Sequence, residues 1–325
     1  MKVVVTGGAG YIGGTVATLL VRAGHSVTVV DNLCHARREA VPQGVEFVQA
    51  DIADRAAMEE LLLRVKPDGV LHFAALIEAG ESMKKPEIYF RNNVAGTLAL
   101  LEAMLAAGVK RIVFSSTAAV YGEPEKVPIE ENARLAPTNA YGESKLIAEQ
   151  MLRWFANAHG FRCAILRYFN VAGALAGRGE EHEPESHLIP LVLDAALGLR
   201  PAISVYGEDY ETPDGTCIRD YIHVVDLADA HILALQALET QSSVLVNLGN
   251  GEGFSVKQVI ETARRVTGRT INAEMRPRRE GDPARLVASA ERAKTLLGWK
   301  PKHAALDDII ASAWEWHKQR FSKAK

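Results

Sequence analysis

Tyr141 and Lys145 are the two residues of this chain whose types and spacing most directly suggest chemistry. Residues four apart on a helix lie on one face, so the Lys145 ammonium can approach the Tyr141 hydroxyl. The pKa of an ordinary tyrosine is about 10, and a nearby cation favours the phenolate and lowers that pKa. We therefore expect Tyr141 to exchange a proton with a substrate hydroxyl. Taken alone, such a pair is more often an ordinary surface pair.

A glycine-rich segment near the N-terminus strengthens the catalytic interpretation. Residues 2–6 are a short run rich in β-branched side chains, which predicts a buried strand, and residues 15–23 have helical apolar spacing. Between them, Gly8, Gly10 and Gly13 satisfy G-x-G-x-x-G in the strand–turn–helix context of a dinucleotide site. The early glycines allow close approach to a pyrophosphate, and the helix N-terminus attracts the anion.

Asp31 indicates which dinucleotide binds. It follows the next predicted strand, residues 26–30, at the distance from Gly13 that suits an acidic residue on the adenosine ribose. A carboxylate there repels a 2′-phosphate, so the sequence favours NAD over NADP. The alternative is a tight turn in a parallel sheet that binds nothing.

Composition excludes several classes of protein. The net charge of −3 gives no reason to expect a nucleic acid or an anionic membrane as partner. No apolar run approaches the roughly 18 residues of a membrane span, and the first predicted strand leaves no room for a signal peptide. Cys34, Cys163 and Cys217 are widely spaced, which predicts free thiols in a reducing, cytoplasmic compartment.

Strands and helices alternate along the first half of the chain. Further strands are expected at 45–49, 69–73, 111–114 and 163–166, and helices at 54–65, 86–107 and 141–158. This alternation predicts an α/β fold: a Rossmann-type, doubly wound parallel sheet whose ligands lie beyond the carboxyl ends of the strands.

The pattern changes near residue 174, where polar loops begin to separate shorter helical segments. We expect a smaller C-terminal α/β lobe that binds substrate and closes over the cofactor. The Rossmann domain would cover residues 1–173 and receive 224–247 as a returning segment. The substrate lobe would cover 174–223 and 248–325.

A run of hydroxyl side chains follows Phe114 at the end of its predicted strand. Ser115, Ser116 and Thr117 are well placed there to hydrogen-bond a substrate oxygen. Considered alone, the run is more typical of a polar turn.

In combination, these motifs resemble the extended short-chain dehydrogenase/reductase family. The N-terminal glycines with Tyr141 and Lys145 are typical of the whole superfamily. Narrower motifs follow in the family's order, at 167–170, 206–210, 212–216, 219–224, 247–251 and 279–282. The resemblance covers almost the whole chain.

The resemblance implies an enzyme with tightly bound NAD that inverts C4 of a UDP-hexose, UDP-glucose or UDP-galactose, through a transient 4-keto sugar. It also implies a homodimer, because members pair through two helices per subunit. Here these would be the helices at 86–107 and 141–158, with outward faces that include Leu98, Leu101, Leu105 and Met151.

Residue by residue, the resemblance makes Tyr141 the acid/base, Lys145 its electrostatic partner and Thr117 the family's catalytic Ser/Thr. Residues expected on the cofactor are Gly7, Gly10, Tyr11, Ile12, Gly13, Asp31, Asn32, Asp51, Ile52, Phe73, Ala74, Ala75, Asn93, Ser115, Tyr141, Lys145 and Tyr168. Residues expected on the substrate are Thr117, Asn170, His187, Leu188, Tyr206, Arg219, Arg279, Asp282 and Leu286.

Within the substrate set, the resemblance gives each part of the nucleotide sugar its own contacts. Asn170, Arg219 and Arg279 would face the phosphates, to which an arginine fork binds well. Tyr206 would face uracil, Asp282 the uridine ribose and Leu286 the C2 group of the sugar. The chain departs from the family at Ile77, where a lysine is frequent, and at His187, where some members have asparagine.

Three alternatives stay open. Another nucleotide-sugar epimerase would share most of these motifs. A 4,6-dehydratase needs carboxylates beside the catalytic hydroxyl, and Ala118 and Ala119 follow Thr117 instead. A non-catalytic NAD-binding regulator would have no use for Tyr141 with Lys145. We expect no metal at His182 and His187, because an acidic loop supplies no fixed tetrahedral geometry.

Overall fold

A seven-stranded parallel sheet forms the centre of the protein. The computed structural model describes residues 1–182, 184–279 and 282–322. The strand order is β11-β6-β5-β4-β1-β2-β3, so the order reverses next to β1, where open α/β sheets bind ligands. The strands are β1 (Lys2–Thr6), β2 (Ser26–Asp31), β3 (Glu46–Gln49), β4 (Gly69–His72), β5 (Arg111–Thr117), β6 (Arg162–Tyr168) and β11 (Ser243–Leu248).

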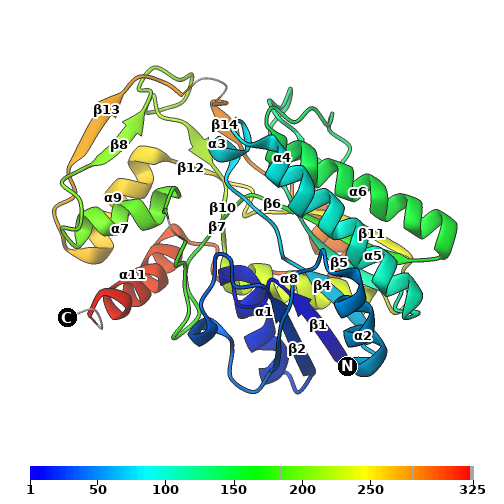
Figure 1. Cartoon of the computed structure of the whole chain (residues 1–325). Coiled ribbons are helices and arrows are strands. Elements are labelled where there is room, and N and C mark those ends of the chain that lie inside the picture. Colours follow the sequence, from blue (N-terminus) through cyan, green and yellow to red (C-terminus); the bar gives the residue numbers. More distant parts are fainter. Residues whose placement is uncertain (183, 280–281, 323–325) are drawn as a thin grey trace.

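Helices cover both faces of this sheet (Figure 1). Successive residues of a strand face opposite sides, and β1 shows this directly. Val3 and Val5 pack with α1 (Tyr11–Arg22), α8 (Val224–Ala237) and α10 (Glu291–Leu297). Val4 packs on the other face with α2 (Arg55–Val65), α5 (Gly96–Ala106) and α6 (Ala140–His159). The expected doubly wound fold is therefore present.

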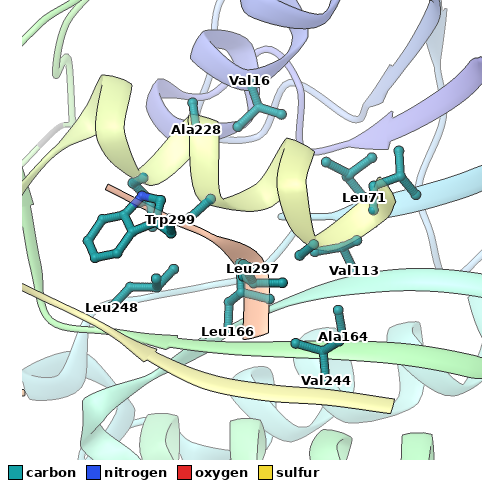
Figure 2. Packing of buried hydrophobic residues seen from close by; sticks show 14 of the residues in the cluster. Val16, Leu71, Val113, Ala164, Leu166, Ala228, Val244, Leu248, Leu297 and Trp299 are labelled. Carbon is teal, nitrogen blue, oxygen red and sulfur yellow. The ribbon is translucent and has the colours of Figure 1, made fainter. Parts of the chain in front are cut away.

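Part of the C-terminal region packs in the core of the large sheet. Figure 2 shows Trp299 and Leu297 close to Leu166 and Leu248, with Ala228 of α8 above them. The Trp299 indole is 1% exposed and donates to the Asp226 carbonyl at 2.8 Å. The range 248–325 expected for the substrate lobe thus includes a segment, 290–299, that belongs to the core of the sheet.

The remaining C-terminal elements gather at the carboxyl edge of the sheet as a smaller lobe, at the left of Figure 1. Its helices share one apolar cluster and are α7 (Leu188–Ala196), α9 (Val256–Thr267) and α11 (Leu306–Ser322). Its strands are β7 (Asn170–Ala172), β8 (Ile203–Tyr206), β9 (Ile218–Arg219), β10 (Tyr221–His223), β12 (Phe254–Ser255), β13 (Ala273–Arg276) and β14 (Arg285–Leu286). Strands this short leave little periodic pattern, so the sequence did not predict most of them.

The helix expected at 86–107 contains a π-helical turn. The chain forms α4 (Pro86–Tyr89), then the π turn Phe90–Ala95, then α5. The turn carries Asn93, whose side chain exchanges two hydrogen bonds of 2.9 Å with the Leu76 backbone. Asn93 also donates to the Ser144 hydroxyl of α6 at 3.0 Å. Such turns are frequent at functional sites, and this one ties the segment after β4 to α6.

None of the helices in the described part of the chain has the length and apolar run needed to cross a membrane.

Candidate active site

The first two turns of helix α6 carry Tyr141 and Lys145 and lie beside the end of β5. Asn139 caps the helix, because its side chain accepts from the Gly142 amide at 2.8 Å. A Cβ on Gly142 would lie 2.6 Å from the Ala119 carbonyl oxygen. Glycine therefore lets the first turn of α6 pack directly on the segment that follows β5.

The Tyr141 hydroxyl meets Thr117, the last residue of β5. Burial raises the pKa of Tyr141 to about 12, the hydrogen bond with Thr117 acts in the opposite direction, and the charge of Glu78 raises it further. The sequence predicted that Lys145 would lower this pKa. The net direction is instead upward, because desolvation of the phenolate is the largest effect.

Lys145 is 3% exposed, and its ammonium donates to the Ser115 carbonyl at 2.8 Å. Its Nζ also lies 4.9 Å from the centroid of the Phe114 ring. Burial lowers the pKa of Lys145 to about 7, and the charge of Glu149 opposes that change. The Lys145 side chain is therefore close to its titration midpoint at neutral pH.

Tyr168 brings a third hydroxyl to this place from β6. The register pairs Thr117 with Tyr168 across β5 and β6, and the Tyr168 hydroxyl bonds the Ser115 hydroxyl. Burial raises the pKa of Tyr168, and the charge of Tyr141 contributes in the same direction. The structure therefore brings together the expected hydroxyl groups and the ammonium.

The turn after β1 has the shape of a dinucleotide cradle. Gly7 has a φ of +71°, and a Cβ there would lie 2.5 Å from the Ala74 amide nitrogen. A Cβ on Gly13 would lie 2.4 Å from the Gly7 carbonyl oxygen. Among the described residues no side chain caps α1 at Gly10, so its first amides remain available to a phosphate. These features fit NAD.

Acidic residues lie at the carboxyl ends of the neighbouring strands β2 and β3: Asp31 ends β2 and Asp51 follows β3. The two carboxylate oxygens of Asp31 accept from the amides of Ala9, at 3.1 Å, and Leu33, at 2.8 Å. The Asn32 side chain donates to Asp51 at 2.9 Å. This holds the loops after both strands together, where the expected adenosine contacts lie. The other expected cofactor contacts also follow strands of the sheet. Ile52, after β3, is buried, and the Phe73 ring, after β4, packs against His231, with Ala74 and Ala75 next in the chain. Ile12, after β1, packs against the apolar core.

Three of the expected substrate residues lie on or beside the short strands of the lobe. Leu286 of β14 pairs in register with Arg219 of β9, and the Arg219 guanidinium forms an ion pair with Asp282. Asp282 is therefore engaged by Arg219, an arrangement that the sequence did not predict. The Arg279 guanidinium stacks 4.0 Å from the centroid of the Tyr206 ring. Glu280 and Gly281 of the motif at 279–282 lie outside the described residues.

Asn170 and His187 already have protein partners in this structure. The Asn170 side chain donates to the Asp220 carbonyl at 3.0 Å. His187 is the N-cap residue of α7, followed by Leu188, and its Nδ1 lies 2.8 Å from a Glu185 oxygen. Hydrogen bonding to Glu185 and nearby carboxylates overcome burial and raise the pKa of His187 to about 9. The His187 imidazole is therefore paired with the Glu185 carboxylate in this structure.

The acidic segment before α7 is fixed to the Rossmann domain at several points. His182 forms an ion pair with Glu78 at 2.8 Å, and the Ser186 hydroxyl donates to Glu78 at 3.0 Å. Just before this segment begins, the Tyr11 hydroxyl donates to the Gly173 carbonyl at 2.7 Å. Within the described part of the chain, no group of three His, Cys, Asp or Glu side chains could hold a metal ion.

The sequence assigned no role in the site to Glu149 or to the Arg167 side chain, and it expected Ser116 to bond a substrate oxygen, whereas the Ser116 hydroxyl bonds Glu149. All three are buried, and Glu149 forms an ion pair with Arg167 beneath the first turns of α6. The spacing rule that links Tyr141 with Lys145 also places Glu149 on their face of the helix, so it could have found this residue.

Known proteins share both the sequence and the fold of this chain. The model of the "NAD dependent epimerase/dehydratase family" matches residues 3–249. The chain belongs to this family. It is 57% identical over 317 residues to the UDP-glucose 4-epimerase of Streptomyces lividans, with 97% of this chain and 96% of that protein covered.

Two solved structures of the NAD dependent epimerase/dehydratase family superimpose closely on the whole chain. The UDP-glucose 4-epimerase from Brucella ovis in complex with NAD has a TM-score of 0.95 at 45% identity, covering 97% of this chain and 98% of that chain. The enzyme from Bifidobacterium longum in complex with NAD+ and UDP has a TM-score of 0.93 at 39% identity, covering 98% of each chain. The fold and the dependence on NAD that the sequence predicted are therefore confirmed.

The cradle geometry predicts that Gly7→Ala abolishes retention of NAD. Its Cβ would collide with the Ala74 amide, 2.5 Å away, and displace the two loops that face the cofactor. Gly24→Ala is the matched control, because Gly24 also has a positive φ, +81°, but its Cβ would meet no described atom within 4 Å. Both changes should cost at least about 1 kcal/mol of folding stability through backbone strain, and Gly7→Ala should cost more because of the added collision. Dinucleotide released per protomer on denaturation should fall only in Gly7→Ala, and equal loss in both variants would contradict the assignment.

Proposed function

We propose that this protein is an NAD-dependent 4-epimerase that interconverts UDP-glucose and UDP-galactose. The observation that carries the proposal is the meeting of the Tyr141, Thr117 and Tyr168 hydroxyls beside the Lys145 ammonium, at the strand end next to the dinucleotide cradle. Family membership and relatives named UDP-glucose 4-epimerase support the same activity.

In this proposal Tyr141 accepts the proton of the C4 hydroxyl, and Thr117 holds the same oxygen by a hydrogen bond. When bound, NAD+ supplies the nicotinamide that accepts the C4 hydride and returns it to the opposite face, and a positive charge that favours the Tyr141 phenolate. Lys145 adds a second positive charge on the same side. Tyr141 then returns its proton to the C4 oxygen, so the cycle produces no net oxidation.

The lobe supplies groups that suit the UDP part of the substrate. The Arg219 and Arg279 guanidiniums can bind a diphosphate, and Tyr206 offers an aromatic face to uracil. Anchoring at UDP leaves the hexose free to turn over between the two hydride transfers. Ala118 and Ala119, beside Thr117, supply no carboxylate, and this disfavours a 4,6-dehydratase.

Incubation of the NAD-loaded protein with UDP-galactose tests the activity directly. Chromatography should show UDP-glucose formed without added NAD+ and without accumulation of a 4-keto or dehydrated product. Tyr141→Phe keeps the ring and should retain NAD, but turnover should fall by at least about two orders of magnitude, the usual worth of a positioned acid/base. No interconversion by the parent protein would refute the proposal, and turnover of Tyr141→Phe within threefold of the parent would remove Tyr141 from its role.

Leu286 is proposed to contact the C2 substituent of the hexose. Its register partner is Arg219, and its side chain packs beside a cluster that includes Ala118 and Phe169, next to Thr117 and Tyr168. These neighbours support a position of Leu286 between the proposed phosphate contact and the catalytic hydroxyls. Leucine is smaller than tyrosine and lacks its hydroxyl, so it should admit an N-acetyl group only partly.

We expect UDP-glucose and UDP-galactose to be preferred and UDP-N-acetylhexosamines to be accepted weakly, because one added group against an apolar wall discriminates by only about 1–3 kcal/mol. Leu286→Tyr should sharpen the preference and Leu286→Ser should relax it. The measurement is the ratio of kcat/KM for the two classes of sugar. An unchanged ratio in both variants would place Leu286 outside the sugar pocket.

A homodimer through α5 and α6 is also part of the proposal. Leu98 on α5 is 39% exposed and Trp154 on α6 is 72% exposed, an unusual exposure for a side chain as large as tryptophan. The sequence also assigned Leu101 to the outward face, and that assignment is wrong because Leu101 is fully buried. Leu105 and Met151 are partly buried against the core.

Sedimentation tests the dimer. The parent should sediment as a dimer, and Trp154→Glu should weaken the association because it places a charge in the apolar contact. Arg153→Gln changes the charge on the neighbouring residue, serves as the comparison and should leave the dimer intact. A parent that stays monomeric at every concentration would refute this part of the proposal.

The three cysteines are free, which supports a cytoplasmic location with reduced thiols. Fractionation of cells that express the protein would test this, and recovery in an oxidising compartment would contradict it.

A further inference from the structure

A fully buried carboxylate lies one helical turn beyond Lys145. Glu149 has no exposed surface, and four donors surround it. The Ser116 hydroxyl bonds its Oε1 at 2.6 Å, and Arg167 bonds both oxygens, with Nε at 2.9 Å and Nη2 at 2.6 Å. The fourth donor, Arg153 Nη2, approaches Oε2 at 3.3 Å from a half-exposed side chain.

Ser116 and Arg167 tie α6 to the two strands that carry the catalytic hydroxyls. Ser116 stands between Ser115, whose carbonyl accepts from Lys145, and Thr117, which meets Tyr141. Arg167 precedes Tyr168 on β6. The Glu149 carboxylate is therefore bonded to the immediate neighbours of the groups that form the site. Because successive residues of a strand face opposite sides, Ser116 bonds away from the site while its neighbours face it.

Stability alone does not explain a pair of charges at this position. Replacing a buried ion pair by apolar residues is often neutral or stabilising, because desolvation offsets the attraction. Arg167 needs further partners to be accommodated, and it donates to the Tyr121 hydroxyl at 3.0 Å and to the Glu131 carbonyl at 3.2 Å. Such an arrangement indicates that the negative charge of Glu149 has a function other than stability.

Lys145 is the buried group whose positive charge the Glu149 carboxylate can stabilise. Its hydrogen-bond acceptor is a neutral carbonyl, that of Ser115. From β4, His72 contributes no positive charge at neutral pH, because burial and the charge of Lys145 lower the pKa of His72 to about 3. From β6, Tyr168 keeps its proton because burial raises its pKa, and the charge of Glu149, not that of its partner Arg167, opposes the lowering of the Lys145 pKa. On α6 itself, Tyr141 and Glu149 share the face of Lys145.

We propose that Glu149 is a positioning residue of this site: its buried carboxylate, held in place by Arg167 and Ser116, keeps Lys145 in the ammonium form. The inference rests on the proposed function, in which the Lys145 charge supports the Tyr141 phenolate. Glu149 itself touches neither substrate nor cofactor in this account and acts only through Lys145.

The sign of the expected pH effect follows from the charges. Burial lowers the pKa of Lys145 to about 7, and Glu149 opposes this. Removing the carboxylate charge lowers the pKa of Lys145 further, so the ammonium is lost at a lower pH. The alkaline limb of the kcat profile should then move to lower pH by about one unit or more. A change that only loosened the structure would lower kcat without moving this limb.

Glu149→Gln is the primary variant, because it keeps the size and an acceptor for Ser116 but removes the charge. It leaves Arg167 buried without a counter-ion, so Glu149→Gln/Arg167→Gln, which removes both charges, decides the outcome if the single variant does not fold. Arg153→Gln is the matched control. It removes the exposed partner of the same carboxylate and should leave the profile unchanged, because such exposed pairs are weak.

Two readouts separate this inference from the proposed function. The first is the pH profile of kcat for UDP-galactose epimerisation by the NAD-loaded variants. The second needs no turnover: an NMR titration of protein labelled with ¹³C-lysine, with the Lys145 signal assigned by its absence in Lys145→Met. The inference predicts that both the limb and the Lys145 pKa move down in the Glu149 variants and stay fixed in Arg153→Gln.

An unchanged Lys145 titration in a folded Glu149 variant would overturn the inference, even if kcat fell. A lowered Lys145 pKa in a protein without epimerase activity would support the electrostatic role and refute the proposed function instead.

Discussion

Desolvation of Tyr141 and Lys145 at the end of β5 is the constraint on which the rest of the site depends. Burial disfavours the charged form of each group, which raises the pKa of Tyr141 to about 12 and lowers the pKa of Lys145 to about 7. The two groups can act together only if neighbouring charges and dipoles reverse part of this effect. The surrounding structure supplies Thr117, the Ser115 carbonyl and Glu149 for that purpose.

The fold places these groups by tight backbone contacts. Gly142 lets α6 pack on the segment after β5, the π turn at Asn93 ties α6 to the segment after β4, and Gly7 lets the turn after β1 approach the segment after β4 closely. Each contact lies at the carboxyl edge of the parallel sheet, beside the reversal of strand order. The same edge receives the lobe, so the nucleotide sugar and the dinucleotide would meet at the catalytic hydroxyls.

The sequence predicted what local patterns encode. The β-branched strands, the glycine turn and the long helices identified the doubly wound sheet, and the i, i+4 rule identified Tyr141 with Lys145. It failed where tertiary contacts decide: the π turn at Asn93, the short strands that pair Leu286 with Arg219, and the packing of Trp299 on the large sheet. It also gave the wrong direction for the pKa of Tyr141, because a spacing rule carries no information about burial.

The central claim is that hydride leaves C4 and returns to C4 within one active site. The most direct measurement follows UDP-galactose deuterated at C4 through conversion by the NAD-loaded protein in ordinary water. The account predicts UDP-glucose that retains the deuterium at C4, with none released to solvent. Loss of the label to water, or entry of solvent hydrogen at C5 or C6, would contradict it.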